Sequence, residues 1–272
     1  MATVIADNVV IDPRAEIEED VQIGPFCVIG PNVRVGRGTK LENSVTLTGR
    51  VTIGSYNHLY PGVVVGAEPQ DISYTGKETQ VIIGDHNTLR ECVTIHRASE
   101  KEDGITRIGD HNFLMACSHV AHDCKLGSHI ILGNCVLVGG HCHIHDHATL
   151  AGGAAVHHYA TIGSFAFVAG LSGVRLDVPP YMLVEGYPAR PRCVNVVALK
   201  RNPFPAEVIE ALAEAHRLLY SPPDGALLPA LTSPPHLQFH LPILPPRHLP
   251  RWLHRPGSDL PRHGTAMKGL PT

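Results

Sequence analysis

The chain has 272 residues, a net charge of −3 and an isoelectric point near 6.7, which gives no case for bulk binding of nucleic acid. The sequence shows no run of eighteen apolar residues and no signal-peptide pattern, so we expect a cytoplasmic protein without a transmembrane segment. Its seven cysteines form no CxxC motif, and we expect buried, reduced thiols.

An aliphatic residue recurs at every sixth position along most of the chain. The repeat is continuous over residues 5–65, returns over 83–95 and runs again over 108–174. A strict hexad indicates a parallel β-helix, because each unit can bury its apolar face only by stacking on its neighbours. Three hexads, or eighteen residues, then make one coil of a triangular prism.

Two other positions of the hexad support the same geometry. The fourth residue after the aliphatic one is small or β-branched, as at Val21, Cys27 and Cys124, and alternation along a short strand points both positions inward. The residue directly after the aliphatic one is often glycine, for example Gly36 and Gly54. We expect these glycines to supply the backbone angles that a corner demands.

Two segments interrupt the hexad. Residues 66–82 lack the aliphatic repeat, and residues 96–107 form a charged stretch. Insertions in a solenoid are extruded as loops, often on a binding face. We therefore expect two loops to leave an otherwise regular prism near a functional site.

The C-terminal third departs from the repeat. The register ends after Val174, and a 3.6-residue period with proline in its first turn predicts a helix over residues 205–220. The expected divisions are a β-helix over 1–185, a short helical region over 186–220 and a proline-rich, poorly structured tail over 221–272.

Many of the 19 histidines fall within the coils, and none of those falls at an inward position. Three valines spaced eighteen residues apart are followed by His122, His141 and His157. Their imidazoles are therefore expected in a row along one edge of the prism, beside the second loop. Such a file suits metal binding or proton transfer. Asp123 directly follows His122, and a carboxylate beside an imidazole raises its basicity and fixes its tautomer.

The run HCHIHDH at residues 141–147 has the composition of a metal-binding tract. Its register argues against that use, because Cys142 and Ile144 point inward while His141 and His143 fall on either side of a corner. Metal ligands must converge within about 2.1 Å of the ion. We expect no metal site within one chain, and a site shared between subunits stays open.

Several motifs together resemble one bacterial enzyme family. They are PQD at 69–71, VTIHR at 93–97, SHVAHDC at 118–124, SGV at 172–174 and DVPPY at 177–181. The likeness covers roughly residues 5–220 and is to the UDP-N-acetylglucosamine acyltransferases, which catalyse the first step of lipid A synthesis.

This resemblance implies a homotrimer of left-handed β-helices with active sites between neighbouring subunits. It implies transfer of a 3-hydroxyacyl group from acyl carrier protein to the 3-hydroxyl of UDP-N-acetylglucosamine. The carrier's phosphopantetheine thioester is then the co-substrate, and no cofactor is expected.

The resemblance also implies roles for individual residues. His122 matches the general base, Asp123 the residue that orients it, and Gly140 the backbone N–H that faces the developing oxyanion. Gly170 matches the position that limits acyl length. The positions that match substrate contacts are Gln70, Asp71, His119, His141, His157, Asn195 and Arg201.

Four positions depart from the family pattern: Ser73, Val197, Asn202 and His158. The first three bear on nucleotide contacts.

Two alternative functions to the acyltransferase remain open. One is a γ-carbonic-anhydrase-like zinc enzyme on the same prism, with three histidines drawn from two subunits. The other is a non-catalytic trimeric scaffold that keeps the fold without the sugar nucleotide.

Overall fold

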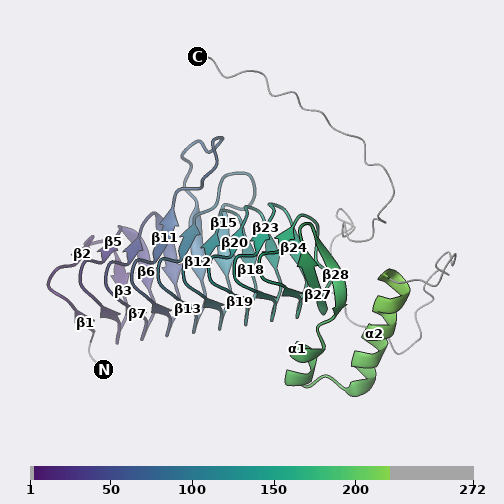
Figure 1. Cartoon of the computed structure of the whole chain (residues 1–272). Coiled ribbons are helices and arrows are strands. Elements are labelled where there is room, and N and C mark those ends of the chain that lie inside the picture. Colours follow the sequence, from purple (N-terminus) through teal and green to yellow (C-terminus); the bar gives the residue numbers. More distant parts are fainter. Residues whose placement is uncertain (1–2, 221–272) are drawn as a thin grey trace, which may run out of the picture.

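The computed structural model describes residues 3–220, and its strands build a prism of stacked coils (Figure 1). Consecutive coils pair in register, with Val4 beside Gln22 and Ile5 beside Ile23. One coil therefore takes eighteen residues, as the hexad predicts. The tail predicted at 221–272 lies outside the described residues.

Three sheets form the three faces of the prism, and we call them sheets A, B and C. Sheet A has eleven strands, in the order β1 (Val4–Ile5), β4 (Gln22–Ile23), β7 (Lys40–Leu41), β10 (His58–Leu59), β13 (Thr88–Leu89), β16 (Phe113–Leu114), β19 (Ile131–Leu132), β22 (Thr149–Leu150), β25 (Phe167–Val168), β27 (Met182–Gly186) and β28 (Ala189–Val194).

The other two sheets consist entirely of parallel strands. Sheet B has the order β2 (Val10–Ile11), β5 (Val28–Ile29), β8 (Thr46–Leu47), β11 (Val64–Ala67), β14 (Thr94–His96), β17 (His119–Val120), β20 (Leu137–Val138), β23 (Ala155–Val156) and β26 (Gly173–Val174). Sheet C has the order β24 (Thr161–Ile162), β21 (His143–Ile144), β18 (Lys125–Leu126), β15 (Ile105–Ile108), β12 (Gln80–Ile83), β9 (Arg50–Ile53), β6 (Asn32–Val35) and β3 (Glu16–Ile17).

The core fills the prism with the two inward positions of each hexad. Leu47 and Leu59 are fully buried, and so are the predicted inward thiols of Cys27, Cys124 and Cys142. Burying an aliphatic side chain of this size stabilises the fold by about 1.5–3 kcal/mol. The hexad therefore specifies the core. The expectation of buried thiols was wrong for the other four cysteines, which lie outside the prism and are exposed.

The glycines of the hexad serve a purpose different from the predicted one. The left-handed backbone angles of the corners fall two residues later, for example at Tyr56, where φ is 56°. A Cβ atom on Gly36 would lie 2.5 Å from the carbonyl oxygen of Gly54, and one on Gly54 would lie 2.6 Å from that of Gly84. The prediction was wrong: these positions lack side chains because adjacent coils pass too closely.

Both interruptions of the hexad leave the edge between sheets B and C, which we call the BC edge. One loop connects β11 to β12 and the other connects β14 to β15 (Figure 1). The two loops protrude on the same side of the prism, so the prediction of extruded loops is confirmed.

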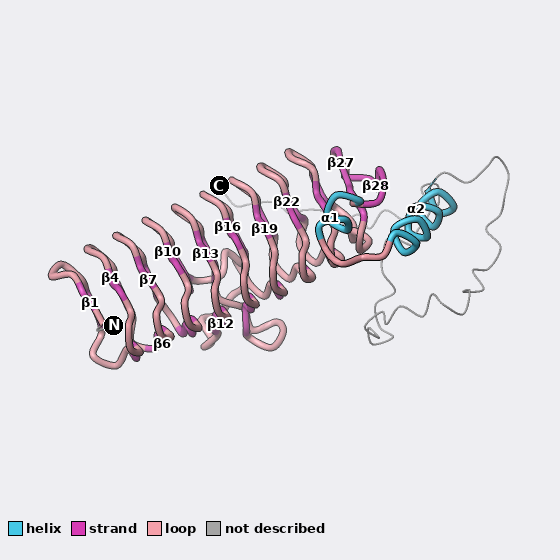
Figure 2. The backbone as a smooth tube through the Cα atoms, turned by 90° about the horizontal axis from the view of Figure 1, so that it is seen from below, coloured by secondary structure: helices cyan, strands magenta, loops and turns pink. Residues whose placement is uncertain are grey.

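The C-terminal end caps the prism with a hairpin and two helices (Figure 2). Strands β27 and β28 pair antiparallel, and α1 (Val196–Arg201) and α2 (Ala206–Tyr220) follow. Helix α2 confirms the helix predicted over 205–220. The range 186–220 is not helical throughout, because β28 occupies its first part and the expected boundary at 185 falls inside β27. Neither helix in the described part of the chain has the length and apolar character needed to cross a membrane.

Candidate functional site

His122 and Asp123 sit together at the BC edge, in the corner that joins β17 to β18. Asp123 has a left-handed backbone with φ of 62°, which turns its side chain back toward its neighbour. His122 Nδ1 lies 2.7 Å from Asp123 Oδ2. The corner therefore makes the hydrogen bond that a straight strand would not allow between adjacent residues.

Asp123 is fully buried and is held by the second loop. Its Oδ2 accepts hydrogen bonds from the Ser99 backbone N–H at 3.0 Å and the Ser99 hydroxyl at 2.7 Å. Burial by itself would raise the pKa of Asp123, but the hydrogen bonds from His122 and Ser99 outweigh it, and the pKa lies below its ordinary value. An ionised Asp123 keeps the His122 proton on Nδ1, and this leaves Nε2 free to accept a proton.

Gly140 lies directly against the Cε1 and Nε2 atoms of the His122 ring, one coil further along. A Cβ atom at this position would lie 2.7 Å from His122 Cε1 and 2.8 Å from Nε2. Within the described chain the Gly140 N–H donates no backbone hydrogen bond, whereas those of Gly139 and His141 both do. A free donor thus lies in the corner that packs on the imidazole.

His141 is 5% exposed, which the register did not predict. It was expected to face solvent, a ligand or a partner, but the second loop covers it. Its Nδ1 lies 2.7 Å from Glu102 Oε1, and its ring stacks on Tyr159 at a centroid distance of 4.4 Å. Its Nε2 lies 3.7 Å from Asp123 Oδ2, and its ring meets His122 edge-on at 5.1 Å.

His119 and His96 form a second pair next to His122. The His119 Nδ1 lies 2.7 Å from the Thr94 hydroxyl, and its ring meets His96 edge-on at 4.9 Å. Burial, followed by the charges of His96 and His122, lowers the pKa of His119 to about 4. Burial also lowers the pKa of His96. Both imidazoles are therefore neutral at physiological pH.

His157 lies further along the same edge and remains exposed. Its Nδ1 lies 3.1 Å from the His158 carbonyl oxygen, and the two rings are 3.8 Å apart. The predicted file of imidazoles is thus present, but its members differ in burial.

The first loop meets the second loop through charged and polar contacts. Asp71 accepts a 2.6 Å hydrogen bond from Lys101, and the Ser73 N–H and hydroxyl bind its other oxygen. The Lys101 ammonium and then Ser73 hold the pKa of Asp71 well below its usual range. Gln70, beside Asp71, is exposed. The loop pair therefore offers an exposed amide and an ionised carboxylate next to the BC edge.

The remaining predicted site residues lie elsewhere on the chain. Asn195 is the N-cap of α1, with its Oδ1 3.3 Å from the Ala198 N–H and its Nδ2 bound to the Phe165 carbonyl. Arg201 ends the same helix and is exposed. Gly170 lies at the edge between sheets A and B, where an added Cβ would lie 3.3 Å from the Gly152 carbonyl.

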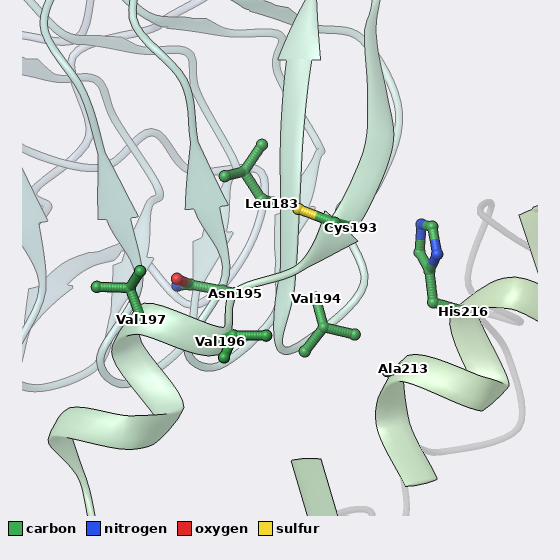
Figure 3. A pocket seen from close by; sticks show the side chains of 8 residues that line it. All are labelled: Leu183, Cys193, Val194, Asn195, Val196, Val197, Ala213 and His216. Carbon is green, nitrogen blue, oxygen red and sulfur yellow. The ribbon is translucent and has the colours of Figure 1, made fainter. Parts of the chain in front are cut away.

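A hollow of about 370 Å³ lies between the C-terminal hairpin, α1 and α2 (Figure 3). Asn195 lines it together with Leu183, Cys193 and His216 from α2. A smaller hollow of about 220 Å³ lies under the first loop beside Tyr74. Neither hollow includes His122, whose side chain is 13% exposed at the BC edge.

Sequence reasoning missed Ser99, Glu102 and Tyr159. Ser99 and Glu102 belong to the second loop, whose path no periodicity specifies. Tyr159 could have been found, because it lies eighteen residues after His141 and therefore one coil above it.

His122, Asp123 and His141 also bring one possible metal ligand each to within 4.8 Å of one another. Two ligands of a tetrahedral ion with bonds of about 2.1 Å lie about 3.4 Å apart. The His122–Asp123 separation of 2.7 Å is too short for that arrangement. The cluster therefore has the geometry of a hydrogen-bonded pair within one chain.

A prism of six-residue repeats with a histidine–carboxylate pair at a loop-bearing edge defines the class of hexapeptide-repeat transferases. The profile for bacterial transferase hexapeptide repeats matches residues 105–140, and that for domain 2 of UDP N-acetylglucosamine O-acyltransferase matches 177–231. The profile for the GMPPB C-terminal domain matches residues 5–100.

Curated relatives named acyl-[acyl-carrier-protein]–UDP-N-acetylglucosamine O-acyltransferase occur in Syntrophobacter fumaroxidans and Thermodesulfovibrio yellowstonii. They are 42% and 45% identical, over 79% of this chain and 84% of each relative. The chain belongs to this acyltransferase family.

Solved structures of the same family resemble this fold. LpxA from Acinetobacter baumannii matches with a TM-score of 0.79 and 39% identity, over 82% of this chain and 86% of its own. The Francisella novicida UDP-N-acetylglucosamine acyltransferase matches with a TM-score of 0.79 and 38% identity, over 83% and 82%. The prism is the left-handed β-helix of these structures, as expected.

Proposed function

We propose that this chain transfers a 3-hydroxyacyl group from acyl carrier protein to the 3-hydroxyl of UDP-N-acetylglucosamine, in the cytoplasm, as a step of lipid A synthesis. The relatives' names supply the two substrates. The observation that carries the chemistry is the chain of hydrogen bonds from Ser99 through Asp123 to His122.

In this reaction His122 is the general base. Its Nε2 takes the proton of the sugar hydroxyl as the hydroxyl oxygen attacks the thioester carbonyl carbon. Asp123 stabilises the imidazolium that forms, since its carboxylate is buried and ionised. When the carbon–sulfur bond breaks, the imidazolium returns its proton to the phosphopantetheine sulfur.

The Gly140 N–H is the proposed donor to the oxyanion. Gly140 packs on the side of the His122 ring that carries Cε1 and Nε2, and we infer that a carbonyl bound to its N–H has its carbon within reach of a hydroxyl on Nε2. Removing one such donor typically costs about 10²–10³ in kcat. Because this donor belongs to the backbone, its test needs a substitution that displaces it.

We also propose that the active unit is a homotrimer. Exposed apolar side chains occur on sheets A and B and at their shared edge: Phe26, Val28, Ile131, Leu137 and Leu171. Sheet C instead exposes charged residues such as Glu16, Arg34 and Arg107. In a cyclic trimer each copy packs on two neighbours, and two apolar faces per copy fit that assembly. The BC edge then meets a neighbour, which supplies the second wall of the site.

Asn195, Arg201 and Gly170 gain proposed roles only in that assembly. In one chain they lie away from His122, so contacts to the nucleotide and to the acyl chain require surfaces from more than one copy. Asn195 keeps its capping role as well, because its side-chain oxygen and nitrogen are both used within the chain.

The test is a product assay with the purified full-length protein. It is incubated with UDP-N-acetylglucosamine and 3-hydroxyacyl carrier proteins of several chain lengths, and products are identified by mass spectrometry. The proposal predicts an O-acylated sugar nucleotide with one preferred length. Saturable sugar-nucleotide binding without product would instead support a scaffold, and activity that depends on added zinc would support a metalloenzyme.

A further inference from the structure

The hollow under the first loop, which we call the loop hollow, has no part in the proposed acyl transfer. Its volume is about 220 Å³, several times that of one water molecule. The lining residues that bear on its chemistry are Arg50, Tyr74, Lys77, Glu78, Thr79 and Arg97. Three of these side chains are cationic and one is anionic, so the loop hollow favours an anionic ligand.

The loop hollow lies apart from the catalytic corner. Gly49 lines it at the corner after β8, whereas His122 lies at the corner after β17, three strands further along sheet B. With a coil rise of about 4.8 Å, the two corners are about 14 Å apart along the prism. Asn32 and Arg50, which also line the hollow, begin β6 and β9. The hollow therefore borders sheet C, the face that the proposed homotrimer does not use.

Two of the cations around the loop hollow keep free hydrogen-bond donors. Arg97 donates from Nη1 to the Gly66 carbonyl at 3.0 Å and from Nη2 to Glu68 at 2.9 Å. A guanidinium has five N–H donors, so others remain for a ligand. The guanidinium carbon lies 5.7 Å from the centre of the Tyr74 ring, which helps to hold it beside the loop. Within residues 3–220 the Lys77 ammonium forms no ion pair, and its three donors are free.

Carboxylates balance only part of this positive charge. Arg50 lies 3.3 Å from Glu78, and Arg97 lies 2.9 Å from Glu68. The two carboxylate side chains are 67% and 73% exposed, and exposed ion pairs contribute little stability. Lys77 therefore leaves one positive charge uncompensated at the loop hollow.

A buried hydroxyl without a partner independently points to a ligand. Thr79 is 5% exposed, and its Oγ1 has no hydrogen-bond partner within the described chain. An unpaired hydroxyl in such a place costs stability. Because Thr79 lines the loop hollow, a ligand bound there can supply the partner that this hydroxyl lacks.

We propose that the loop hollow binds a phosphate group, as inorganic phosphate or as a small phosphate monoester. Lys77, Arg97 and Thr79 offer an ammonium, a guanidinium and a hydroxyl from three separate side chains. A phosphate group matches them with three acceptor oxygens and a charge between −1 and −2 at pH 7. A carboxylate has a single charge and two oxygens, so it matches this set of donors less well.

The test is a calorimetric titration of the full-length protein with inorganic phosphate at constant ionic strength, repeated with glycerol phosphate as the monoester. We expect one saturable site per chain, and the tighter of the two ligands identifies the source of the phosphate group. Lys77→Gln should weaken binding at least about tenfold, because it removes a charge-assisted hydrogen bond.

Arg34→Gln is the matched control. It removes a cation from sheet C, but Arg34 does not line the loop hollow, so the affinity should stay within about twofold of the wild type. Without phosphate, Lys77→Gln should keep the wild-type rate of acyl transfer, since the loop contact from the Tyr74 hydroxyl goes to the Lys77 backbone carbonyl. Failure of this proposal is therefore distinct from failure of the proposed function.

Thr79→Val separates a ligand-binding hydroxyl from a structural one. The variant should bind phosphate about fivefold more weakly, because a neutral hydrogen bond is lost. Without phosphate its unfolding temperature should equal or exceed that of the wild type, because valine buries no unpaired hydroxyl.

Four results would overturn the proposal. The first is the absence of saturable phosphate binding by the wild type. The second is equal weakening by Arg34→Gln and Lys77→Gln, which would indicate only general attraction of anions to the surface. The third is loss of phosphate binding when UDP-N-acetylglucosamine is saturating, which would place the phosphate in the catalytic site. The fourth is a Thr79→Val protein that is less stable without phosphate but binds it with unchanged affinity.

Discussion

Glu102 and His141 are joined by a 2.7 Å hydrogen bond between Oε1 and Nδ1, although 39 residues separate them. The bond ties the second loop to the coil above His122. It also holds the His141 ring so that its other nitrogen faces Asp123 at 3.7 Å. The loop is therefore part of the site, and its sequence sets the orientation of an imidazole that the prism alone leaves free.

We predict that Glu102→Ala lowers kcat/KM for acyl transfer by about 10-fold, because a ring that loses its orienting partner occupies the productive position for less of the time. Glu102→Gln should lose less, since an amide oxygen can still accept the Nδ1 proton. Steady-state kinetics of the three proteins measures the difference.

The matched control lies on the same loop. Asp103→Asn removes a partly exposed ion pair to Lys125, which includes neither His122 nor His141. It should leave kcat/KM within about twofold of the wild type. If both variants lose activity equally, the loop matters only for its fold, and the role of Glu102 is refuted.

Asp123→Asn should lower kcat by about 10²–10⁴-fold, because an amide can hold His122 in the wrong tautomer and cannot stabilise its cation. Ser99→Ala should lower kcat less, since the Ser99 backbone N–H still reaches the carboxylate at 3.0 Å. Circular dichroism should show both variants folded. A fully active Asp123→Asn protein would remove the carboxylate from the mechanism.

Gly140→Ala should lower kcat by about 10²-fold or more, because its methyl group would lie within 2.8 Å of the His122 ring and would push the ring aside. Gly30→Ala is the matched control. An added Cβ there lies 3.4 Å from the Leu47 carbonyl oxygen, on a coil far from His122. Normal turnover by Gly140→Ala would show that the corner accommodates the methyl group without displacing the His122 ring.

The free energy of unfolding should depend on pH because of His119. Its pKa is about 4 when folded, against an ordinary value of 6.5, so between these values the unfolded chain binds a proton that the folded chain does not. Stability should therefore fall as pH falls from 6.5 toward 4, by up to about 2 kcal/mol between pH 7 and pH 5. Urea unfolding at the two pH values should show a smaller drop for His119→Gln. Equal drops would show that His119 is not the group responsible.

The hexad predicts the prism because it is a property of single residues at fixed spacing. Cys27, Cys124 and Cys142 were placed inside from their register alone, and they are fully buried. The His122–Asp123 pair followed from the same register together with a family resemblance. The hairpin of β27 and β28 was missed, since it obeys neither the hexad nor a helical period.

The burial of His141 could not be predicted in the same way. The register places it outside the prism, which is correct, but the extruded loop then returns to cover it through Glu102. Loop conformation depends on contacts such as Asp71 with Lys101 and Thr75 with Glu100, which join residues 25 to 30 positions apart. Such pairings have no periodic signature.

The proposed mechanism depends most on His122 as the base that activates the sugar hydroxyl. The direct measurement is the single-turnover rate of acyl transfer by His122→Ala, with saturating acyl carrier protein thioester and UDP-N-acetylglucosamine. We expect a rate at least about 10³-fold below the wild type, with sugar-nucleotide binding retained. A His122→Ala protein that acylates the sugar at the wild-type rate would contradict it.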